Sequence, residues 1–432
     1  MSFADFGLHP LVLKSLDTEG YATPTPVQAA SIPPALAGRD ILATAATGTG
    51  KTAAFLLPAL SRIAAAPKPG GVGSPRILVL APTRELATQV TQAVRKHGKF
   101  LKLTSADIVG GMPFRAQLQQ MSRPLDIVVA TPGRLIDHMQ RGRLNLAHVE
   151  VLVLDEADRM LDMGFAEDVD LIAKACSPAR QTMLFTATLD GRMSGLAGRL
   201  LKTPARIAVD PAAAALAIEH RLYQTNHMGH KRRLLNHFAG SSEVTKAIIF
   251  VATKRDADSL AQDLSRDGHR AAALHGDMDQ HQRNHTMHRL RGPDLRLLVA
   301  TDVAARGIDV RDISHVFNFD LPRSAADYVH RIGRTGRAGA TGIAISFAGA
   351  ADREIVRNIE RLTKSKLAVH VVAGLEAGPM PARPAGRPDA RPPRPAGRPG
   401  GHAGKPQRPW TKSYKTGGPR RAKKLWASQT AR

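Results

Sequence analysis

Residues 45–52 of the chain are Ala45-Ala46-Thr47-Gly48-Thr49-Gly50-Lys51-Thr52. Such a glycine-rich segment, ending in a lysine and a threonine, is typical of a phosphate-binding loop. In these loops successive backbone N–H groups surround phosphate oxygens, the lysine adds positive charge and the threonine hydroxyl faces Mg²⁺. Ala45 stands where the general pattern has its first glycine, so the segment alone is also compatible with an ordinary glycine-rich turn.

A second polar segment, Asp155-Glu156-Ala157-Asp158, follows the apolar run Val-Leu-Val-Leu at residues 151–154. This run predicts a buried parallel strand. The strand would deliver Asp155 to a metal ion and Glu156 to an attacking water. Together with residues 45–52, the segment predicts a nucleoside triphosphatase site.

Short apolar runs alternate with helical segments through the first 375 residues, which predicts parallel sheets with helices on both faces. In the first half we expect strands at 40–43, 77–80, 127–130, 151–154, 183–185 and 205–209. In the second half we expect them at 247–251, 297–300, 316–319 and 343–347. Each half therefore predicts its own doubly wound α/β domain.

Composition changes mark the predicted boundaries: a first domain over 1–209, a small-residue hinge over 210–219, a second domain over 220–375 and a tail over 376–432. Residues 66–75, rich in Gly and Pro, predict a surface loop. The tail consists largely of Arg-Pro and Gly-Arg repeats with few aliphatic residues, and such a composition favours disorder.

The 432-residue chain has 61 Lys and Arg against 37 Asp and Glu, a net charge of +24, which predicts a polyanionic partner. The tail alone has 14 Lys and Arg against Glu376 and Asp389, which is +12 of that total. Cys176 is the only cysteine, so no intrachain disulfide can form, and we expect it to be a small buried residue. No signal peptide or membrane-spanning run is recognisable, and we expect a cytoplasmic protein without membrane contact.

Further polar segments follow predicted strands, where open α/β sheets bind ligands. In the first half they are residues 82–87, 110–111, 131–134 and 186–188. In the second half they are residues 300–309 and 330–337, which include Arg331, Arg334 and Arg337. Since the second half has no phosphate loop, we expect these arginines to reach the first domain's nucleotide and to neutralise charge on its γ-phosphate.

These segments, with Gly20-Tyr21-Ala22-Thr23-Pro24-Thr25-Pro26-Val27-Gln28 and an upstream Phe3, resemble the DEAD-box ATP-dependent RNA helicases of superfamily 2. The bacterial RhlE-like branch is the nearest match. The resemblance covers residues 3 to about 370 and implies two tandem RecA-like domains. It also implies ATP and Mg²⁺ as cofactors and RNA as the partner.

The resemblance implies a role for each matching residue of the ATP site. Phe3 would stack on adenine and Gln28 would hydrogen-bond its edge. Asp309 would complete the nucleotide site from the second domain, where Arg334 and Arg337 would act as catalytic arginines beside Lys51, Asp155 and Glu156. The remaining expected ligands of phosphate or Mg²⁺ are Thr47, Gly48, Thr49, Gly50, Lys51, Thr52 and Asp155.

The resemblance also implies two further groups of residues. RNA contacts are expected from Arg84, Gly111, Thr131, Gly133, Arg134, Gly276, Gln280, Arg283 and Thr301. Contacts that couple the ATP site to the RNA site are expected from Asp158, Thr186, Thr188 and His330. Hydroxyls, backbone amides and arginines suit phosphate and 2′-OH groups, so we expect binding of single-stranded and duplex RNA with little sequence preference.

The implied mechanism is local strand separation, in which ATP and RNA jointly close the two domains and hydrolysis reopens them. A DNA helicase and a nucleotide-gated RNA clamp are the alternatives. Ribosomal or RNA-decay assemblies are candidate settings, and we expect a monomer.

Two segments allow a further hypothesis. In the tail, Trp410, Tyr414 and Trp426 lie among basic residues, which predicts a nonspecific RNA tether, with a solubilising or protein-binding tail as the alternative. Five histidines cluster between residues 269 and 288: His269, His275, His281, His285 and His288. The last three have helical spacing. Without a cysteine or a carboxylate at ligand spacing, a mildly basic exposed helix is favoured over a metal site.

Overall fold

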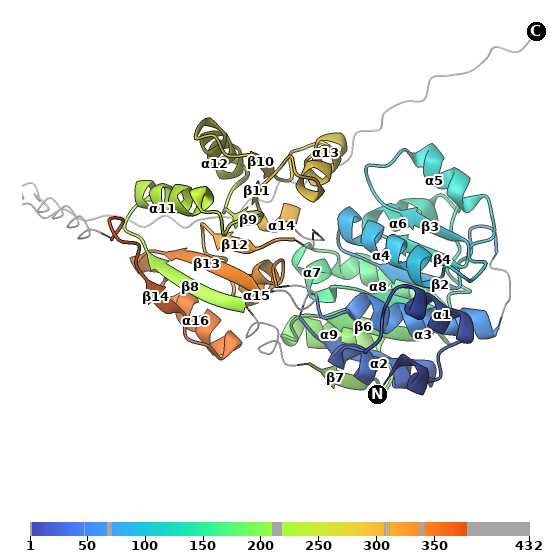
Figure 1. The fold of residues 1–432 in the computed structure, drawn as a ribbon. Coiled ribbons are helices and arrows are strands. Elements are labelled where there is room, and N and C mark those ends of the chain that lie inside the picture. Colours follow the sequence, from blue (N-terminus) through green and yellow to red (C-terminus); the bar gives the residue numbers. More distant parts are fainter. Residues whose placement is uncertain are drawn as a thin grey trace, which may run out of the picture. The chain divides into compact units, whose positions relative to one another are not determined.

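The structure is a computed structural model that describes residues 2–46, 48–66, 71–209, 218–305, 308, 310, 312–336 and 341–377. These residues belong to one compact unit that contains two parallel sheets of seven strands each (Figure 1). The predicted strand runs are confirmed within one or two residues at most ends. The predicted tail lies outside the described residues except for its first two, and so does most of the predicted hinge.

The first half of the chain contains one sheet and its covering helices. Its strands are β1 Ile41–Thr44, β2 Ile77–Leu80, β3 Ser105–Ile108, β4 Ile127–Ala130, β5 Val151–Leu154, β6 Gln181–Thr186 and β7 Ala205–Ala208. Its helices are η1 Phe3–Phe6, α1 Pro10–Thr18, α2 Pro26–Leu36, α3 Lys51–Ala65, α4 Arg84–His97, α5 Phe114–Met121, α6 Pro132–Gln140, α7 Ala157–Asp162, α8 Ala166–Ala175 and α9 Gly191–Leu200.

The second half contains the other sheet. Its strands are β8 Ile218–Gln224, β9 Ala247–Phe250, β10 Ala271–Leu274, β11 Leu297–Ala300, β12 His315–Asn318, β13 Gly342–Ala348 and β14 Ala368–His370. Its helices are α11 Met228–Gly240, α12 Lys254–Arg266, α13 Gln280–Arg291, α14 Asp302–Ala305, α15 Ala325–Ile332, η2 Ala350–Asp352 and α16 Arg353–Thr363. Because β8 already begins at Ile218, residues 218 and 219 belong to this sheet and not to the predicted linker.

The two sheets have the same topology. The first has the order β3-β4-β2-β5-β6-β1-β7 and the second has β10-β11-β9-β12-β13-β8-β14, which is the first order with seven added to every strand number. Neighbouring strands are parallel throughout. The chain therefore consists of two tandem domains of one RecA-like architecture.

Alternating side chains of the central strands explain why helices cover both faces of the first sheet. In β2 and β5, Ile77 and Val151 point to one hydrophobic core, and Leu78 and Leu152 point to the other. Helices α1 to α4 supply the first core and α5 to α9 the second. Since both faces are buried, each central strand is an uninterrupted apolar run, and the polar residues gather at the strand ends.

Candidate functional site

The candidate site lies at the carboxyl ends of three neighbouring strands. Strands β5, β6 and β1 are adjacent in the sheet, so the segments that follow them meet at one edge. These segments are residues 155–158, residues 186–188 and residues 45–52. We call residues 45–52 the phosphate loop. The backbone N–H of Ala45 donates to the Thr186 carbonyl at 2.9 Å, which continues the strand pairing into the loop.

Left-handed glycines shape the phosphate loop. Gly48 and Gly50 have φ angles of 86° and 91°, and Gly50 is the N-cap of α3. The Lys51 ammonium donates to the Ala45 carbonyl at 3.0 Å. Because this contact uses only the backbone of residue 45, an alanine can stand where the general pattern has a glycine. The loop therefore presents the N-terminus of a fifteen-residue helix, a place that favours anions.

Gln28 supports the phosphate loop from the neighbouring helix α2. Its Nε2 donates to the Gly50 carbonyl at 3.1 Å, and its Oε1 accepts from the Thr25 backbone N–H at 2.9 Å. A Cβ atom on Gly50 would lie 2.5 Å from Gln28 Nε2. The sequence alone does not predict this contact. The family resemblance implies that Gln28 binds adenine, and that role stays a prediction. Phe3 is 4% exposed and packs edge-to-face on Phe6, so its stacking on adenine likewise stays a prediction.

Asp155 is a buried carboxylate directly after β5. Its side chain is 2% exposed, and Oδ1 accepts from the Glu156 backbone N–H at 3.0 Å. Burial raises the pKa of Asp155 to about 7, although the charge of Lys51 opposes the shift. A cation beside this carboxylate would favour its ionised form.

The oxygen donors at this edge fit Mg²⁺. This ion commonly binds through one or two carboxylates together with substrate phosphates and waters. Asp155 and the Thr52 hydroxyl would supply the protein ligands. No group of three or more His, Cys, Asp or Glu side chains suited to a metal occurs among the described residues.

Glu156 has a strained backbone at the site. Its φ and ψ of 50° and 52° place it in the left-handed region, and its side chain is 4% exposed. A residue with a side chain adopts this conformation at a cost of about 1–2 kcal/mol. Such strain persists where surrounding structure holds it, often at functional positions. The turn at Glu156 lets α7 begin immediately after the strand.

The predicted coupling residues lie close together. Thr188 Oγ1 donates to Asp158 Oδ2 at 3.1 Å, and His330 Nε2 lies 3.5 Å from the same oxygen. Thr186 Oγ1 donates to the Thr188 carbonyl at 2.7 Å. Burial alone would raise the pKa of Asp158, but the His330 hydrogen bond and neighbouring positive charges hold it below the ordinary value. Burial lowers the pKa of His330, against the effect of Asp158.

An ion pair beside this cluster was not foreseen from the sequence. The Arg159 guanidinium lies 2.5 Å from Asp327 Oδ1, and the Arg159 side chain is 5% exposed. Arg159 follows Asp158 directly, and Asp327 lies one helical turn before His330 on α15. At this location residues of the two halves therefore meet through two acidic–basic contacts. No motif signal identified this pair, because Arg159 and Asp327 are remote in sequence.

The arginines of residues 330–337 differ in their surroundings. Arg331 is 3% exposed and binds Asp302 through two hydrogen bonds of 2.6 and 2.7 Å. The expectation that Arg331 reaches the nucleotide is therefore wrong, because its guanidinium is held by its own domain. Arg334 donates to the carbonyls of Ile308 at 3.0 Å and His330 at 3.3 Å, and its catalytic role stays a prediction. Thr47, Asp309 and Arg337 lie outside the described residues.

Several of the expected RNA-binding residues meet one another. Arg84 Nη1 donates to Gln280 Oε1 at 2.9 Å, and Arg283 Nη2 lies 2.6 Å from Glu85 Oε1. The guanidinium of Arg84 also lies against Gly111, where an added Cβ atom would overlap Nη1. These contacts place Arg84, Gln280 and Arg283 in one cluster.

The other expected RNA-binding residues occupy strand ends or helix starts. Thr131 is the N-cap of α6, which contains Gly133 and Arg134, and Arg134 Nη1 donates to the Met112 carbonyl at 3.2 Å. Gly276 follows β10, and Thr301 follows β11. Gly133 and Gly276 have open space where a Cβ atom would lie, so no close approach there requires glycine.

The structure also describes Cys176 and the histidines of α13, for which the sequence allowed further hypotheses. Cys176 is 4% exposed in a hydrophobic core, and burial raises the pKa of its thiol to about 12. His281, His285 and His288 are exposed on α13, as expected for a mildly basic helix. The aromatic residues of the tail lie outside the described residues, so the RNA tether stays a prediction.

Comparison with known proteins gives matches over both domains. The family model described as DEAD/DEAH box helicase matches residues 25–194, and the helicase conserved C-terminal domain matches residues 230–339. The chain belongs to the DEAD-box ATP-dependent RNA helicases. The ATP-dependent RNA helicase SrmB of Haemophilus influenzae is 44% identical over 385 residues, 88% of this chain and 87% of that protein. SrmB of Escherichia coli is 44% identical over 86% of this chain and 84% of its own length.

Solved structures of this helicase family confirm the tandem fold. S. cerevisiae Dbp5 bound to RNA and ADP BeF3 is 32% identical, with a TM-score of 0.77, over 85% of this chain and 95% of that one. Mss116p bound to ssRNA and AMP-PNP has the same TM-score at 29% identity and covers 86% and 80% of the two chains. The finer assignment of this DEAD-box helicase to the RhlE-like branch stays a prediction.

Proposed function

We propose that this helicase separates short RNA duplexes locally, by RNA-stimulated ATP hydrolysis at the edge formed by β1, β5 and β6. The observation that carries the proposal is the phosphate loop beside the buried Asp155 and Glu156, with the Asp158–His330 contact joining this edge to the second domain. Related proteins with RNA and a nucleotide analogue bound support both ligands.

At the ATP site we assign the phosphates to the loop amides and Lys51. When bound, Mg²⁺ would supply positive charge to the phosphates, held by Thr52 and Asp155. Glu156 would orient or deprotonate the attacking water. Its left-handed backbone conformation sets the direction in which its side chain leaves the main chain. Asp309, Arg334 and Arg337 are the proposed contributors from the second domain.

At the RNA site we assign phosphate and 2′-OH contacts to the residues around Arg84, Thr131 and Thr301. Such contacts carry no base information, so binding with little sequence preference follows. A strand bound jointly by both domains would favour their closed arrangement, as would ATP. Each ligand then strengthens binding of the other, by thermodynamic linkage. Asp158, Thr188 and His330 are positioned to transmit this coupling.

The metal assignment is tested by ATP hydrolysis at increasing Mg²⁺ concentration with saturating RNA. Asp155→Asn should lose at least a hundredfold in rate, because the buried carboxylate is the expected metal ligand. Asp168→Asn on α8 is the matched control and should behave like wild type. A full rate for Asp155→Asn at ordinary Mg²⁺ would refute the assignment.

We further propose a monomeric cytoplasmic protein that acts on RNA within ribosomal or RNA-decay assemblies. Its support is general: the strongly basic charge and RNA-helicase relatives. Among the described residues no helix has the length and apolar character needed to cross a membrane. Co-sedimentation of the protein with ribosomal particles or with decay enzymes from cell extract would separate the two settings.

A further inference from the structure

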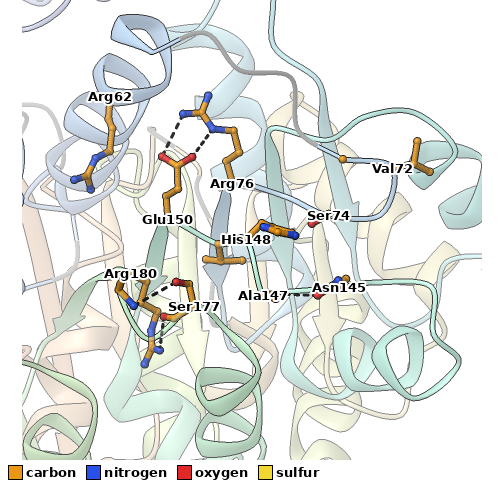
Figure 2. A pocket seen from close by; sticks show the side chains of 13 residues that line it. Arg62, Val72, Ser74, Arg76, Asn145, Ala147, His148, Glu150, Ser177 and Arg180 are labelled. Atoms are coloured by element: carbon orange, nitrogen blue, oxygen red, sulfur yellow. Dashed lines mark hydrogen bonds and ion pairs between the residues drawn. The ribbon is translucent and has the colours of Figure 1, made fainter.

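A pocket of about 740 Å³ lies at the amino-terminal edge of the first sheet (Figure 2). It is formed by Arg62 near the end of α3 and by the segments that precede β2, β5 and β6. Apart from Phe3 and Gln28, the residues assigned to ATP and RNA in this domain occupy segments that follow the strands. The pocket therefore belongs to the opposite edge of the same sheet, and none of the residues assigned to ATP or RNA lines it.

The lining of this pocket is basic. Arg62, Arg76 and Arg180 line it together with a single acidic residue, Glu150. Arg76 is 4% exposed and pairs with Glu150 through contacts of 2.8 and 3.2 Å, which Figure 2 shows. One carboxylate is thus already bound by a guanidinium in the pocket, and two further arginines leave a positive surplus.

Arg62 is exposed and Arg180 is half-buried, and each guanidinium makes one hydrogen bond that orients it and leaves most of its donors unused. Arg62 Nη1 donates to Gln181 Oε1 at 2.8 Å, and the Gln181 amide is itself anchored by the carbonyls of Ala35 and Arg39. Arg180 Nη1 donates to the Ser177 carbonyl at 3.1 Å. A guanidinium has five N–H donors. Within the described parts of the chain these are the only hydrogen bonds of the two groups, and the buried Nε of Arg180 has no partner there.

The chemistry of this lining selects an oxyanion. Held guanidinium groups bind phosphate or carboxylate oxygens with little loss of side-chain freedom. The lining residues that the structure describes include no Trp, Tyr or Phe, so this part of the pocket offers no aromatic ring on which bases could stack. Lys202, whose Nζ donates to the Pro178 carbonyl at 2.5 Å, adds a further positive charge to the segment before β6.

We propose that this pocket binds backbone phosphates of RNA that extends beyond the strand held at the carboxyl edge. The proposal rests on the proposed RNA-binding function. Because helices cover both faces of this sheet, RNA extending from the carboxyl ends of the strands to the pocket would pass over the outer surface of these helices, a path longer than the about 13 Å that four-residue strands such as β2 and β5 span. Arg62 and Arg180 supply the contacts to phosphate, and Arg76 stays paired with Glu150. The pocket thereby lengthens the RNA footprint without adding sequence preference.

The test compares full-length wild type with Arg62→Gln/Arg180→Gln, using single-stranded RNAs of about 8 and about 30 nucleotides. Both proteins should bind the short RNA equally and show equal ATPase stimulation by it. On the long RNA the double variant should bind roughly tenfold more weakly at low salt. The slope of log affinity against log salt should fall by about 1.4, since each lost single-strand phosphate contact contributes about 0.7.

Two further variants and one direct measurement make the result decisive. Arg62→Lys/Arg180→Lys should retain the long-RNA slope, because it keeps both charges, and Arg199→Gln on α9 should behave like wild type. With 4-thiouridine in the flanking nucleotides, crosslinks should map to residues 145–150 or 177–180. Unchanged long-RNA slope and no such crosslinks, with normal stimulation by the short RNA, would overturn the pocket proposal alone. Loss of all RNA stimulation in wild type would instead refute the proposed function.

Discussion

Replacing Gly50 by alanine tests how the phosphate loop is held. Gly50 has a φ of 91°, which costs a residue with a side chain about 1–2 kcal/mol. The new Cβ would also lie 2.5 Å from Gln28 Nε2 and 3.2 Å from Thr25 Oγ1, and overpacking of this kind costs about 1–3 kcal/mol. We expect the free energy of unfolding to fall by about 2–5 kcal/mol in urea titrations, and ATP affinity to fall with it.

Gly142 offers the matched control. Its φ is 64°, but nothing lies within 4 Å of a Cβ placed there. Gly142→Ala should therefore lose only the backbone cost, about 1–2 kcal/mol. Adding Gln28→Ala to Gly50→Ala removes the clashing amide, so the double variant should be more stable than the sum of the single effects predicts. Equal losses at Gly50 and Gly142, with additive behaviour toward Gln28, would refute the contact.

Three other predictions concern single buried groups. Burial lowers the pKa of His97 from 6.5 to about 4, so the unfolded chain binds a proton that the folded chain does not, and stability is lost as pH falls through this window. Between pH 7.5 and 5 this loss should be about 2 kcal/mol in urea titrations, and His97→Leu should remove it. Glu156→Gly should abolish hydrolysis yet raise the free energy of unfolding by about 1 kcal/mol, because it relieves the left-handed backbone; a less stable variant would contradict this. Arg331→Ala should lower the free energy of unfolding by about 3 kcal/mol, whereas the exposed Arg199→Ala should change it little; a stable but inactive Arg331→Ala would restore a role at the nucleotide.

Most central strands and the edge strand β7 could be predicted from the sequence, whereas the edge strands β3 and β10 could not. Strands such as β2 and β5 are buried on both faces and are continuous apolar runs. The edge strands β3, Ser105–Ile108, and β10, Ala271–Leu274, are only partly buried. β3 alternates polar and apolar residues over only four positions, with Ile108 as its one strongly strand-favouring residue, and β10 consists mostly of alanine, which has little preference for strands. Neither segment therefore contains the continuous apolar run that marks the central strands.

The residues of the ATP site were recognisable because they lie in short contiguous motifs. The side chains that contact them could not be predicted, because folding brings these side chains together from distant parts of the sequence. The phosphate loop and Asp155-Glu156 each lie directly after a predictable strand. The Gln28–Gly50 bond, the Arg159–Asp327 pair and the turn of Arg331 toward Asp302 join residues far apart in sequence. A single sequence contains no record of such pairings, so motif position placed Arg331 at the nucleotide and the packing placed it elsewhere.

The most direct test of the whole account is steady-state ATP hydrolysis with single-stranded RNA, with single-stranded DNA of the same sequence, and without nucleic acid. Wild type and Glu156→Gln are measured side by side. The account predicts strong stimulation by RNA, little by DNA, and no RNA-stimulated turnover in Glu156→Gln. Equal stimulation by DNA, or full activity of Glu156→Gln, would contradict it.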